Sequence, residues 1–312
     1  MSPVGPAEPA TPPPPPGLSA ETETQLRAAG LDPAAVVDLV GRALVEDLGD
    51  GGDITSLTTV PEHAHCTVEV VSRSAGTLAG LPVLLAVADL APGSVTVRLR
   101  CPDGSRLQPG RAVARLTGQT RAVLAIERTA LNLLGHLSGV ASLTASWVAA
   151  VAGTGARIRD TRKTLPGLRS LEKYAVRCGG GVNHRSGLFD AILVKDNHVA
   201  AAGGIGTALD AALRAEGERG VGVQVEVDDL AQLEQAVSRG AGQILLDNFD
   251  LATLRTAVSR VRRSGRPVVL EASGGLRLAD ACAVAETGVD LLAVGALTHS
   301  APQLDIGLDW VG

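Results

Sequence analysis

The sequence predicts an α/β protein in which a small N-terminal unit of helices and strands precedes a parallel barrel. Over residues 65–118, apolar and polar residues alternate between turn signals, which is typical of half-buried strands. After residue 155, six short apolar runs each end in polar residues or glycine and lead into a helical segment, which indicates βα units in series. With 45% hydrophobic and 20% charged residues, the 312-residue chain has the composition of a soluble globular protein with one large barrel or two modest domains.

The N-terminal unit begins after a segment that has nothing to bury. Residues 1–20 hold eight of the 17 prolines, which predicts a disordered, proline-rich tail. Asp32, as the N-cap, and Pro33, as the first helical residue, open a helix that ends near Gly49. Strands of a small sheet are expected over 65–72, 95–99 and 111–116, and a long helix over 121–151 that breaks at Gly135.

The C-terminal half repeats one pattern six times. Since six βα units follow one another with no sign of a sheet edge, we expect a parallel barrel rather than an open doubly wound sheet. In such barrels the catalytic residues lie at the C-terminal ends of the strands, which is where the polar residues of this chain fall. The apolar runs end at 160–163, 195–197, 226, 247–248, 273–275 and 295.

Composition and charge exclude several classes of protein. The longest unbroken apolar run, residues 81–88, is too short to cross a bilayer, and the N-terminus lacks the basic and apolar regions of a secretory signal. Four cysteines without metal-ligand spacing predict a reduced, cytoplasmic chain. A net charge of −5 and a pI near 5.7 argue against a general nucleic-acid binder.

The segment 157–185 is the main candidate for ligand chemistry. It has eight basic and two acidic residues, and its only aromatic residue is Tyr174, so base stacking on nucleic acid is not indicated. A small, highly anionic ligand explains this charge better than a solvated face does, because Arg162 and Lys163 directly follow a strand-like run. Arginine fills 25 of the 28 basic positions, so the three lysines are mild evidence that a compact ammonium is needed at each: Lys163, Lys173 and Lys195.

Two carboxylates end later strands. Glu226 and Asp247 each follow an apolar run, where strand propensity explains them poorly. Two interpretations stay open: each caps the next helix, or together they hold ribose hydroxyls or a hydrated Mg²⁺ that carries a diphosphate.

Glycines and a histidine complete the candidate site. Glycine-containing turns follow the last two strands, where backbone N–H groups of parallel barrels bind phosphate; they hold Ser273, Gly274, Gly275 and Gly295. His184 stands beside Arg185 in a loop with three consecutive glycines, which favours ligand contact over a role in the core.

Together these motifs resemble the quinolinate phosphoribosyltransferase family, the decarboxylating nicotinate-nucleotide pyrophosphorylases of NAD biosynthesis. The resemblance covers about residues 30–310 and leaves out the proline-rich tail. The matching stretches are 160–169, 171–176, 179–185 and 193–198, together with 127–134, 137–139, 225–227, 245–248 and 271–275.

The resemblance implies a fold and an assembly. It implies an incomplete α/β barrel of about seven strands with an N-terminal α/β sandwich, to which the C-terminal segment returns. The predicted parts are a tail over 1–20, a sandwich over 21–130 with 299–312 packed on it, and a barrel over 131–298. It further implies a cytoplasmic homodimer or higher homo-oligomer whose active site is completed by the neighbouring subunit, with no nucleic-acid or membrane partner.

The resemblance also implies site residues and a metal. Lys163, Glu226 and Asp247 are the expected catalytic residues, and Mg²⁺ is expected to arrive with phosphoribosyl diphosphate near the two carboxylates rather than in a dedicated cage. Lys195→Ala is expected to weaken quinolinate recognition and to leave phosphoribosyl diphosphate binding little changed. Quinolinate would contact Arg128 of the neighbouring subunit and Thr161, Arg162, Lys163, His184, Arg185 and Lys195; phosphoribosyl diphosphate would contact Glu226, Asp247, Ser273, Gly274, Gly275 and Gly295.

Three alternative functions share part of this pattern. A Schiff-base barrel aldolase would use Lys195 as its nucleophile, but it leaves Glu226, Asp247 and the arginines unexplained. A pyrophosphorylase-like homologue linked to molybdenum transport would share much of the barrel, and the full basic set argues against it. A ligand-sensing homologue without catalysis is disfavoured because every charged position of the motifs is present.

Overall fold

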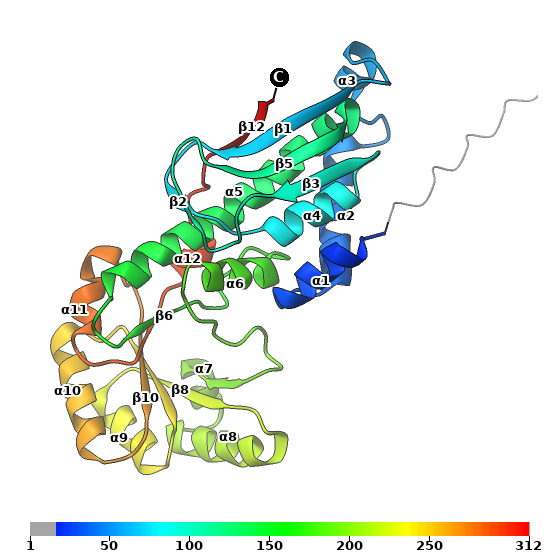
Figure 1. Ribbon diagram of the computed structural model, residues 1–312. Helices are drawn as coiled ribbons and strands as arrows, with labels where there is room; N and C mark the ends of the chain where they lie inside the picture. Colours follow the sequence, from blue (N-terminus) through cyan, green and yellow to red (C-terminus); the bar gives the residue numbers. More distant parts are fainter. Residues whose placement is uncertain (1–16, 312) are drawn as a thin grey trace, which may run out of the picture.

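The computed structural model describes residues 17–311 and contains two main β-sheets with one long helix, α5 (Thr120–Ala150), running between them (Figure 1). One sheet is antiparallel and is built from the N-terminal part of the chain and its C-terminal end. The other is parallel and holds the C-terminal half. Residues 1–16, the greater part of the predicted tail, and Gly312 lie outside the described residues.

Three helices precede the antiparallel sheet: α1 (Ala20–Ala28), α2 (Pro33–Leu48) and α3 (Ile54–Thr59). The helix predicted to open at Asp32 and Pro33 is confirmed as α2, and the Asp32 side chain accepts a hydrogen bond from the Ala34 N–H. Helix α1 was not predicted, because Leu26 is its only buried apolar side chain. Its N-cap, Ser19, and its first residue lie within the segment that was predicted as tail.

The antiparallel sheet has the strand order β12-β1-β5-β3. The strands predicted near 65, 95 and 111 are confirmed, and the sheet is completed by the C-terminal strand, which pairs antiparallel with β1 from Val68 opposite Trp310 to Ser72 opposite Ile306. Its strands are β1 (His65–Ser72), β3 (Val95–Leu99), β5 (Ala112–Gln119) and β12 (Ile306–Trp310), while β2 (Gly76–Thr77) and β4 (Arg106–Leu107) form a small separate pair and α4 (Leu81–Asp89) packs against α5.

Helix α5 is continuous, so the break predicted at Gly135 is wrong. A Cβ atom at Gly139 would lie 2.1 Å from the Pro302 backbone oxygen, and one at Gly135 would lie 3.0 Å from the Leu304 oxygen. These glycines therefore let the returning C-terminal segment cross the helix closely. By length and composition α5 could span a membrane, but half of its most apolar window is buried inside the protein, as is usual for a core helix. The predicted domain boundary at residue 130 falls inside α5.

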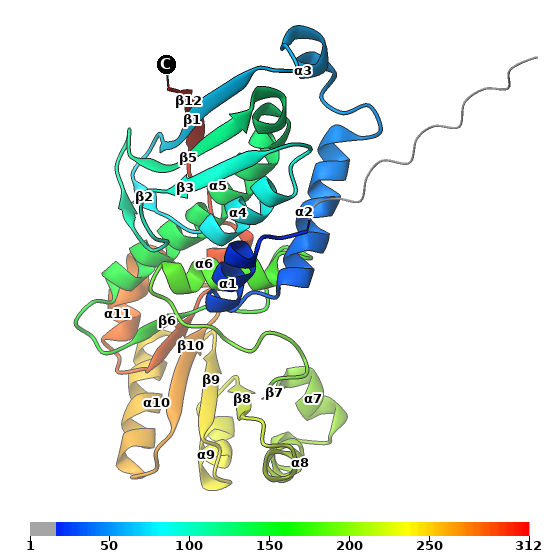
Figure 2. The same cartoon turned by 45° about the vertical axis from the view of Figure 1, so that its right-hand side comes forward.

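The parallel sheet has the order β6-β11-β10-β9-β8-β7, so the first strand of the barrel pairs with the last. Figure 2 shows β10, β9, β8 and β7 following one another across this sheet. Its strands are β6 (Arg157–Arg159), β7 (Ile192–Val194), β8 (Val223–Val227), β9 (Gln243–Asp247), β10 (Val269–Ser273) and β11 (Leu291–Ala293). Its helices are α6 (Arg169–Cys178), α7 (Asp196–Ala201), α8 (Ile205–Arg219), α9 (Leu230–Ser238), α10 (Leu251–Arg263), the 3₁₀ turn η1 (Leu278–Asp280), α11 (Ala281–Ala285) and α12 (Ala296–His299).

The predicted barrel is confirmed in its parallel order and is incomplete. The seventh strand that the resemblance implied is reduced to one parallel bridge between Arg159 and Val182. No strand pairing joins Val182 to β7 within residues 17–311. The gap in the barrel therefore falls between these two, and the connection across it carries His184 and Arg185.

Candidate active site

A cavity of about 360 Å³ lies at the C-terminal ends of the parallel strands. Nine of the thirteen predicted site residues line it: Thr161, Arg162, Lys163, His184, Arg185, Lys195, Glu226, Asp247 and Ser273. Leu193, Leu245, Glu271 and Ala293 complete the lining. The strand-end rule thus brings together side chains from the C-terminal ends of five strands, β6 to β10, and from the loop that precedes β7.

Alternation along the strands explains why these side chains converge. Residues two apart on a strand point to the same face, so Gln224 and Glu226 of β8 share a face, as do Glu271 and Ser273 of β10. The register places Ser273 beside Asp247 of β9. The pairing also sets Glu226 level with Leu245 and, through Leu245, with Glu271. Asp247 and Ser273 therefore lie nearest the strand ends, Glu226 and Glu271 lie one step deeper, and Gln224 lies deeper still along β8.

Four predicted residues are not part of this lining. Gly295 lies next to it, since a Cβ atom there would be 3.1 Å from Lys163 Cδ. Gly274 has φ +95° and would place a Cβ atom 2.1 Å from Asn248 Oδ1, so the turn after β10 requires glycine. Gly275 also has positive φ. Arg128 is exposed on α5, and no ion pair to it is found within residues 17–311.

The cavity wall holds polar atoms that the protein itself does not satisfy. Among residues 17–311, the buried side-chain nitrogen and oxygen atoms without a hydrogen-bond partner are Arg162 Nε, Arg185 Nε and Glu271 Oε1, and all three residues line this cavity. Buried polar groups are normally paired, and exceptions concentrate where a ligand binds. Two guanidinium groups that keep an unpaired donor suit a ligand with carboxylate or phosphate oxygens.

A lysine and a carboxylate that were predicted for different substrates meet at the mouth of the cavity. Lys195 Nζ lies 2.5 Å from Glu226 Oε2. Asp247 Oδ2 accepts a hydrogen bond from Asn248 Nδ2 at 2.7 Å, and Asn248 itself has φ 56°. The cap interpretation of Asp247 does not hold, because Asp250 is the residue that caps the following helix.

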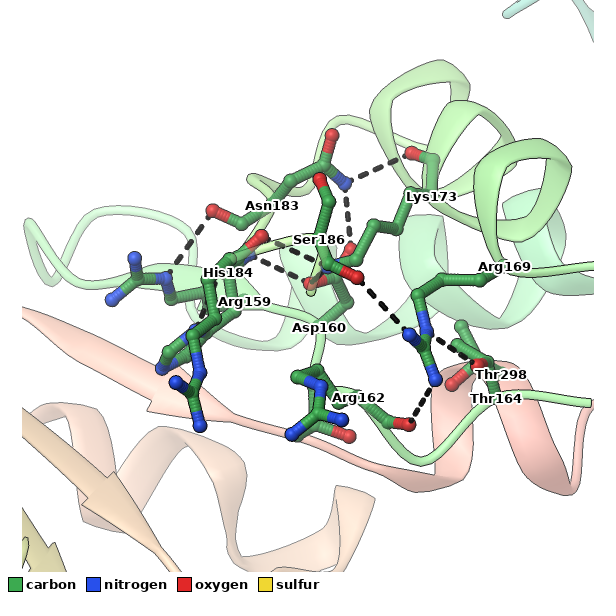
Figure 3. A network of polar contacts seen from close by, with 12 residues as sticks. Arg159, Asp160, Arg162, Thr164, Arg169, Lys173, Asn183, His184, Ser186 and Thr298 are labelled. Atoms are coloured by element: carbon green, nitrogen blue, oxygen red, sulfur yellow. Dashed lines mark hydrogen bonds and ion pairs between the residues drawn. The ribbon is translucent and has the colours of Figure 1, made fainter. Parts of the chain in front are cut away.

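A buried ion pair that the sequence analysis missed supports the loop with His184. Asp160 Oδ1 lies 2.6 Å from Lys173 Nζ and also accepts the His184 backbone N–H at 2.7 Å, while Lys173 donates to the His184 carbonyl at 2.9 Å (Figure 3). Asn183 Nδ2 donates to Asp160 Oδ2 at 2.6 Å. Burial raises the pKa of the Asp160 carboxyl, and the Lys173 ammonium opposes this shift. The scarcity of lysine was the one signal that singled out Lys173.

Helix α6 connects this pair to the rest of the protein through its two neighbouring residues. Glu172 contacts His136 of α5 at 2.9 Å and accepts the Leu165 N–H at 3.2 Å. Tyr174 donates its hydroxyl proton to Asp103, between β3 and β4, at 2.5 Å. Three successive side chains of α6 therefore tie the cavity loops to α5 and to the loop between β3 and β4.

His184 takes part in a second network that the sequence analysis missed. Its Nε2 lies 2.8 Å from Gln224 Oε1, Gln224 Nε2 lies 2.8 Å from Glu271 Oε2, and Arg159 Nη1 lies 2.7 Å from the same oxygen. Burial, followed by the positive charge of Arg159, lowers the pKa of His184 to about 4. Gln224 stands inside an apolar strand rather than at its end and has no signal in the sequence, and Glu271 is marked only as the first residue of the matching stretch 271–275.

Comparison with known proteins places this site in a family. Residues 53–138 match the N-terminal domain and residues 140–309 the C-terminal domain of quinolinate phosphoribosyl transferase. The chain is 51% identical, over 88% of its length and 97% of the relative, to the nicotinate-nucleotide pyrophosphorylase [carboxylating] of Mycobacterium leprae. It is 41% identical to a probable enzyme of the same name from Bacillus subtilis, over 87% of this chain and 92% of that one.

Solved structures agree with these matches. The nicotinate-nucleotide pyrophosphorylase of Francisella tularensis superposes with a TM-score of 0.83 at 36% identity, covering 89% of this chain and 96% of that one. With both domains matched and the strand-end residues gathered around one cavity, the chain belongs to the quinolinate phosphoribosyltransferase family.

Proposed function

We propose that this protein transfers the phosphoribosyl group of phosphoribosyl diphosphate to quinolinate and releases nicotinate mononucleotide, CO₂ and diphosphate, a step of de novo NAD biosynthesis. The observation that carries the proposal is the cavity in which Arg162 and Arg185 each keep a buried, unpaired Nε donor while Glu226 and Asp247 stand among the cations. The guanidinium groups can bind the two carboxylates of quinolinate, and the two carboxylates of the protein can stabilise the positive charge that develops on the ribose. This reaction needs both kinds of group in one small site.

Quinolinate is a planar dianion, and the basic side of the cavity matches it. Guanidinium forks bind carboxylates in two-pronged fashion, so Arg162 and Arg185 are the principal carboxylate ligands. Thr161 and Lys163 follow the same strand end, and the Thr161 hydroxyl accepts the Lys163 backbone N–H at 3.0 Å. Both ring nitrogens of His184 are already hydrogen-bonded within the chain, so this ring borders the ligand through its carbon atoms.

Phosphoribosyl diphosphate occupies the side with Glu226, Asp247 and Ser273. The turns at 274–275 and 295 bring backbone N–H groups close to its phosphates. The metal that the family implies fits this side: Glu226 and Asp247 offer two carboxylates, and among residues 17–311 no cluster of three metal-ligating side chains exists. That donor set would hold a Mg²⁺ ion that arrives with the diphosphate, and the ion would neutralise the charge of the leaving group.

The chemistry requires orientation and charge more than proton transfer. The pyridine nitrogen forms a bond to C1′ of the ribose as the bond from C1′ to the diphosphate oxygen breaks, with the electron pair leaving on the diphosphate. Glu226 and Asp247 stabilise the positive charge that develops on the ribose. The C2 carboxylate then leaves as CO₂, its electron pair stays at C2 beside the positively charged ring nitrogen, and C2 takes a proton from solvent. Lys163, next to Gly295, balances the negative charge of both substrates.

The remaining parts of the proposal concern assembly and location. Arg128, exposed on α5 and outside the cavity lining, completes the quinolinate site of a second copy in a homodimer. The enzyme acts in the cytoplasm, as a reduced chain with four free cysteines. Lys195 paired with Glu226 disfavours the aldolase alternative, which needs an unpaired amine.

A direct assay tests the reaction. Purified protein is incubated with phosphoribosyl diphosphate, Mg²⁺ and quinolinate that carries an isotope label in its C2 carboxylate. Nicotinate mononucleotide and labelled CO₂ are expected in equal amounts. Nicotinic acid should be a very poor substitute, because it leaves buried cations unpaired. Comparable turnover with nicotinic acid, or no product with quinolinate, would refute the assignment.

A further inference from the structure

The hydrogen bonds of the His184 ring define its protonation state. The backbone N–H of Arg185 donates to His184 Nδ1 at 2.7 Å. A backbone N–H can only donate, so Nδ1 carries no proton and the ring proton is on Nε2. Nε2 in turn donates to Gln224 Oε1 at 2.8 Å.

The orientation of the Gln224 amide is fixed from its other side. Its Nε2 lies 2.8 Å from Glu271 Oε2, and a carboxylate only accepts hydrogen bonds, so the amide oxygen must face His184. Arg159 Nη1 donates to the same Glu271 oxygen at 2.7 Å and holds the carboxylate in place. Gln224 is 4% exposed and Glu271 is fully buried, so water does not compete for these bonds.

We propose that Glu271 is a positioning residue: acting through Gln224, it holds His184 as the neutral ring with its proton on Nε2, and the bare Nδ1 then fixes the backbone of Arg185 so that its guanidinium faces the substrate carboxylate. The consequence for the substrate rests on the proposed function, whereas the state of the ring does not. If Nδ1 were protonated, its N–H and the Arg185 backbone N–H would both be donors facing each other. The hydrogen bond that holds the Arg185 backbone would then be lost.

The charges around the ring act in the same direction. Burial is the largest effect that disfavours a positive imidazole, and only the hydrogen bond to Gln224 opposes it. The positive charges of Arg159 from β6, Lys173 from α6 and Arg185 from the loop itself act in the same direction as burial. Of the carboxylates near it, Asp160 is paired with Lys173 and Glu271 with Arg159. The ring therefore stays neutral across the physiological pH range, and the cavity keeps one geometry.

The first test keeps the size of the side chain at position 271 but no longer fixes which group of the network donates and which accepts each hydrogen bond. In Glu271→Gln the new amide can donate or accept, so the Gln224 amide is free to turn and the ring loses its single tautomer. The dissociation constant of quinolinate, measured by calorimetry, should rise by roughly 10-fold or more, as is usual for supports behind ligand-binding side chains. That of phosphoribosyl diphosphate should change less than about twofold by this reasoning.

The second test exchanges the amide and the carboxylate between positions 224 and 271, so that the donor and acceptor of each hydrogen bond are fixed again. In Gln224→Glu/Glu271→Gln, the carboxylate at position 224 accepts from His184 Nε2 and from the amide at position 271, so the Nε2 tautomer should return at high pH. The carboxylate now touches the ring and raises its pKa, so quinolinate binding should weaken as the pH falls from 8 to 6. Wild-type binding should stay flat over that range. Glu234→Gln, which removes a surface carboxylate paired with Arg260, is the matched control and should change neither property.

The ring itself is observed without substrate, by nitrogen NMR of protein labelled in its histidine rings, with His184→Asn used to assign the signal. A neutral Nε2–H ring at pH 7 in the wild type and a mixture in Glu271→Gln are expected. A ring protonated on Nδ1 or on both nitrogens overturns the inference, whatever the activity. Unchanged quinolinate binding in a folded Glu271→Gln variant overturns it as well. A wild type that fails to bind quinolinate would instead refute the proposed function.

Discussion

Lys195 Nζ and Glu226 Oε2 form an ion pair of 2.5 Å across the mouth of the cavity, and it links the two halves of the proposed site. Glu226 is almost fully buried, whereas the Lys195 side chain is 43% exposed. Removing the lysine therefore leaves a buried carboxylate unpaired next to two anionic substrates. The sequence analysis had assigned the two residues to separate substrates.

Lys195→Ala should for this reason weaken both ligands. Quinolinate recognition should lose about 2–5 kcal/mol, the usual cost of truncating one member of a charge pair that the bound ligand desolvates. Phosphoribosyl diphosphate should also bind less tightly, because Glu226 now repels it, and Lys195→Ala/Glu226→Gln should recover part of that second loss. Calorimetry with each substrate measures this, and undiminished phosphoribosyl diphosphate binding in the single variant would show that the ion pair does not couple the sites.

Arg128 provides the test of a shared site. Lys195→Ala and Arg128→Ala are each expected to be inactive. If Arg128 serves the partner's cavity, unfolding the two variants together and refolding them makes about half of the dimers mixed, each with one intact site, and activity returns to roughly a quarter of wild type. If Arg128 serves its own chain, every site lacks one residue and mixing restores nothing. Mass spectrometry confirms that mixed dimers have formed.

Lys173 should matter for stability as much as for activity. Lys173→Met leaves the fully buried Asp160 carboxylate without its cation and should cost about 3–5 kcal/mol in the free energy of unfolding. Lys173→Met/Asp160→Asn should recover part of this loss. The control is Arg27→Met, which breaks an exposed pair with Glu23 and should cost less than about 1 kcal/mol. Urea unfolding measures the stability of all three variants. An equal loss of unfolding free energy in Lys173→Met and Arg27→Met would contradict the role of burial.

His184 should make the fold sensitive to acid in a defined window. Its pKa is about 4 in the folded chain and near 6.5 when unfolded, so between these values the unfolded state binds the extra proton. Stability therefore falls as the pH drops through this window, by at most about 2–3 kcal/mol, since the ring is partly exposed. Unfolding at pH 7, 5.5 and 4 should show a shallower fall in His184→Gln. His63→Gln, at an exposed loop residue, should keep the wild-type slope.

Two glycines in helices should respond to alanine in opposite ways. Gly139→Ala places a methyl group 2.1 Å from the Pro302 oxygen, so the C-terminal segment must move and stability should fall. Gly41→Ala, in α2, meets no atom within 4 Å and should add about 0.5–1 kcal/mol through helix propensity. Thermal unfolding of the pair checks this, and stabilisation by both substitutions would contradict the close crossing.

The sequence by itself determined the features that depend on neighbours along the chain. The N-cap at Asp32, the alternating strands and the polar residues that end parallel strands follow from local pattern. Together with the family motifs, these patterns pointed to thirteen site residues, and nine of them line one cavity. A strand and its end are recognisable because their periodicity and turn residues lie within a few positions of one another. The family motifs lie at the same strand ends.

The tertiary structure alone decided which of these residues share a hydrogen bond or a charge. Arg159, His184, Gln224 and Glu271 stand on separate barrel segments, and Glu271 lies 112 positions from Arg159. Gln224 and Glu271 sit inside strands that have the pattern of an apolar core, and no local pattern links either of them to His184 or Arg159. Closing the barrel buries them together, and each must then find its partner among the others because water is excluded. The same closure pairs Lys195 with Glu226, and the returning C-terminal segment explains the glycines of α5.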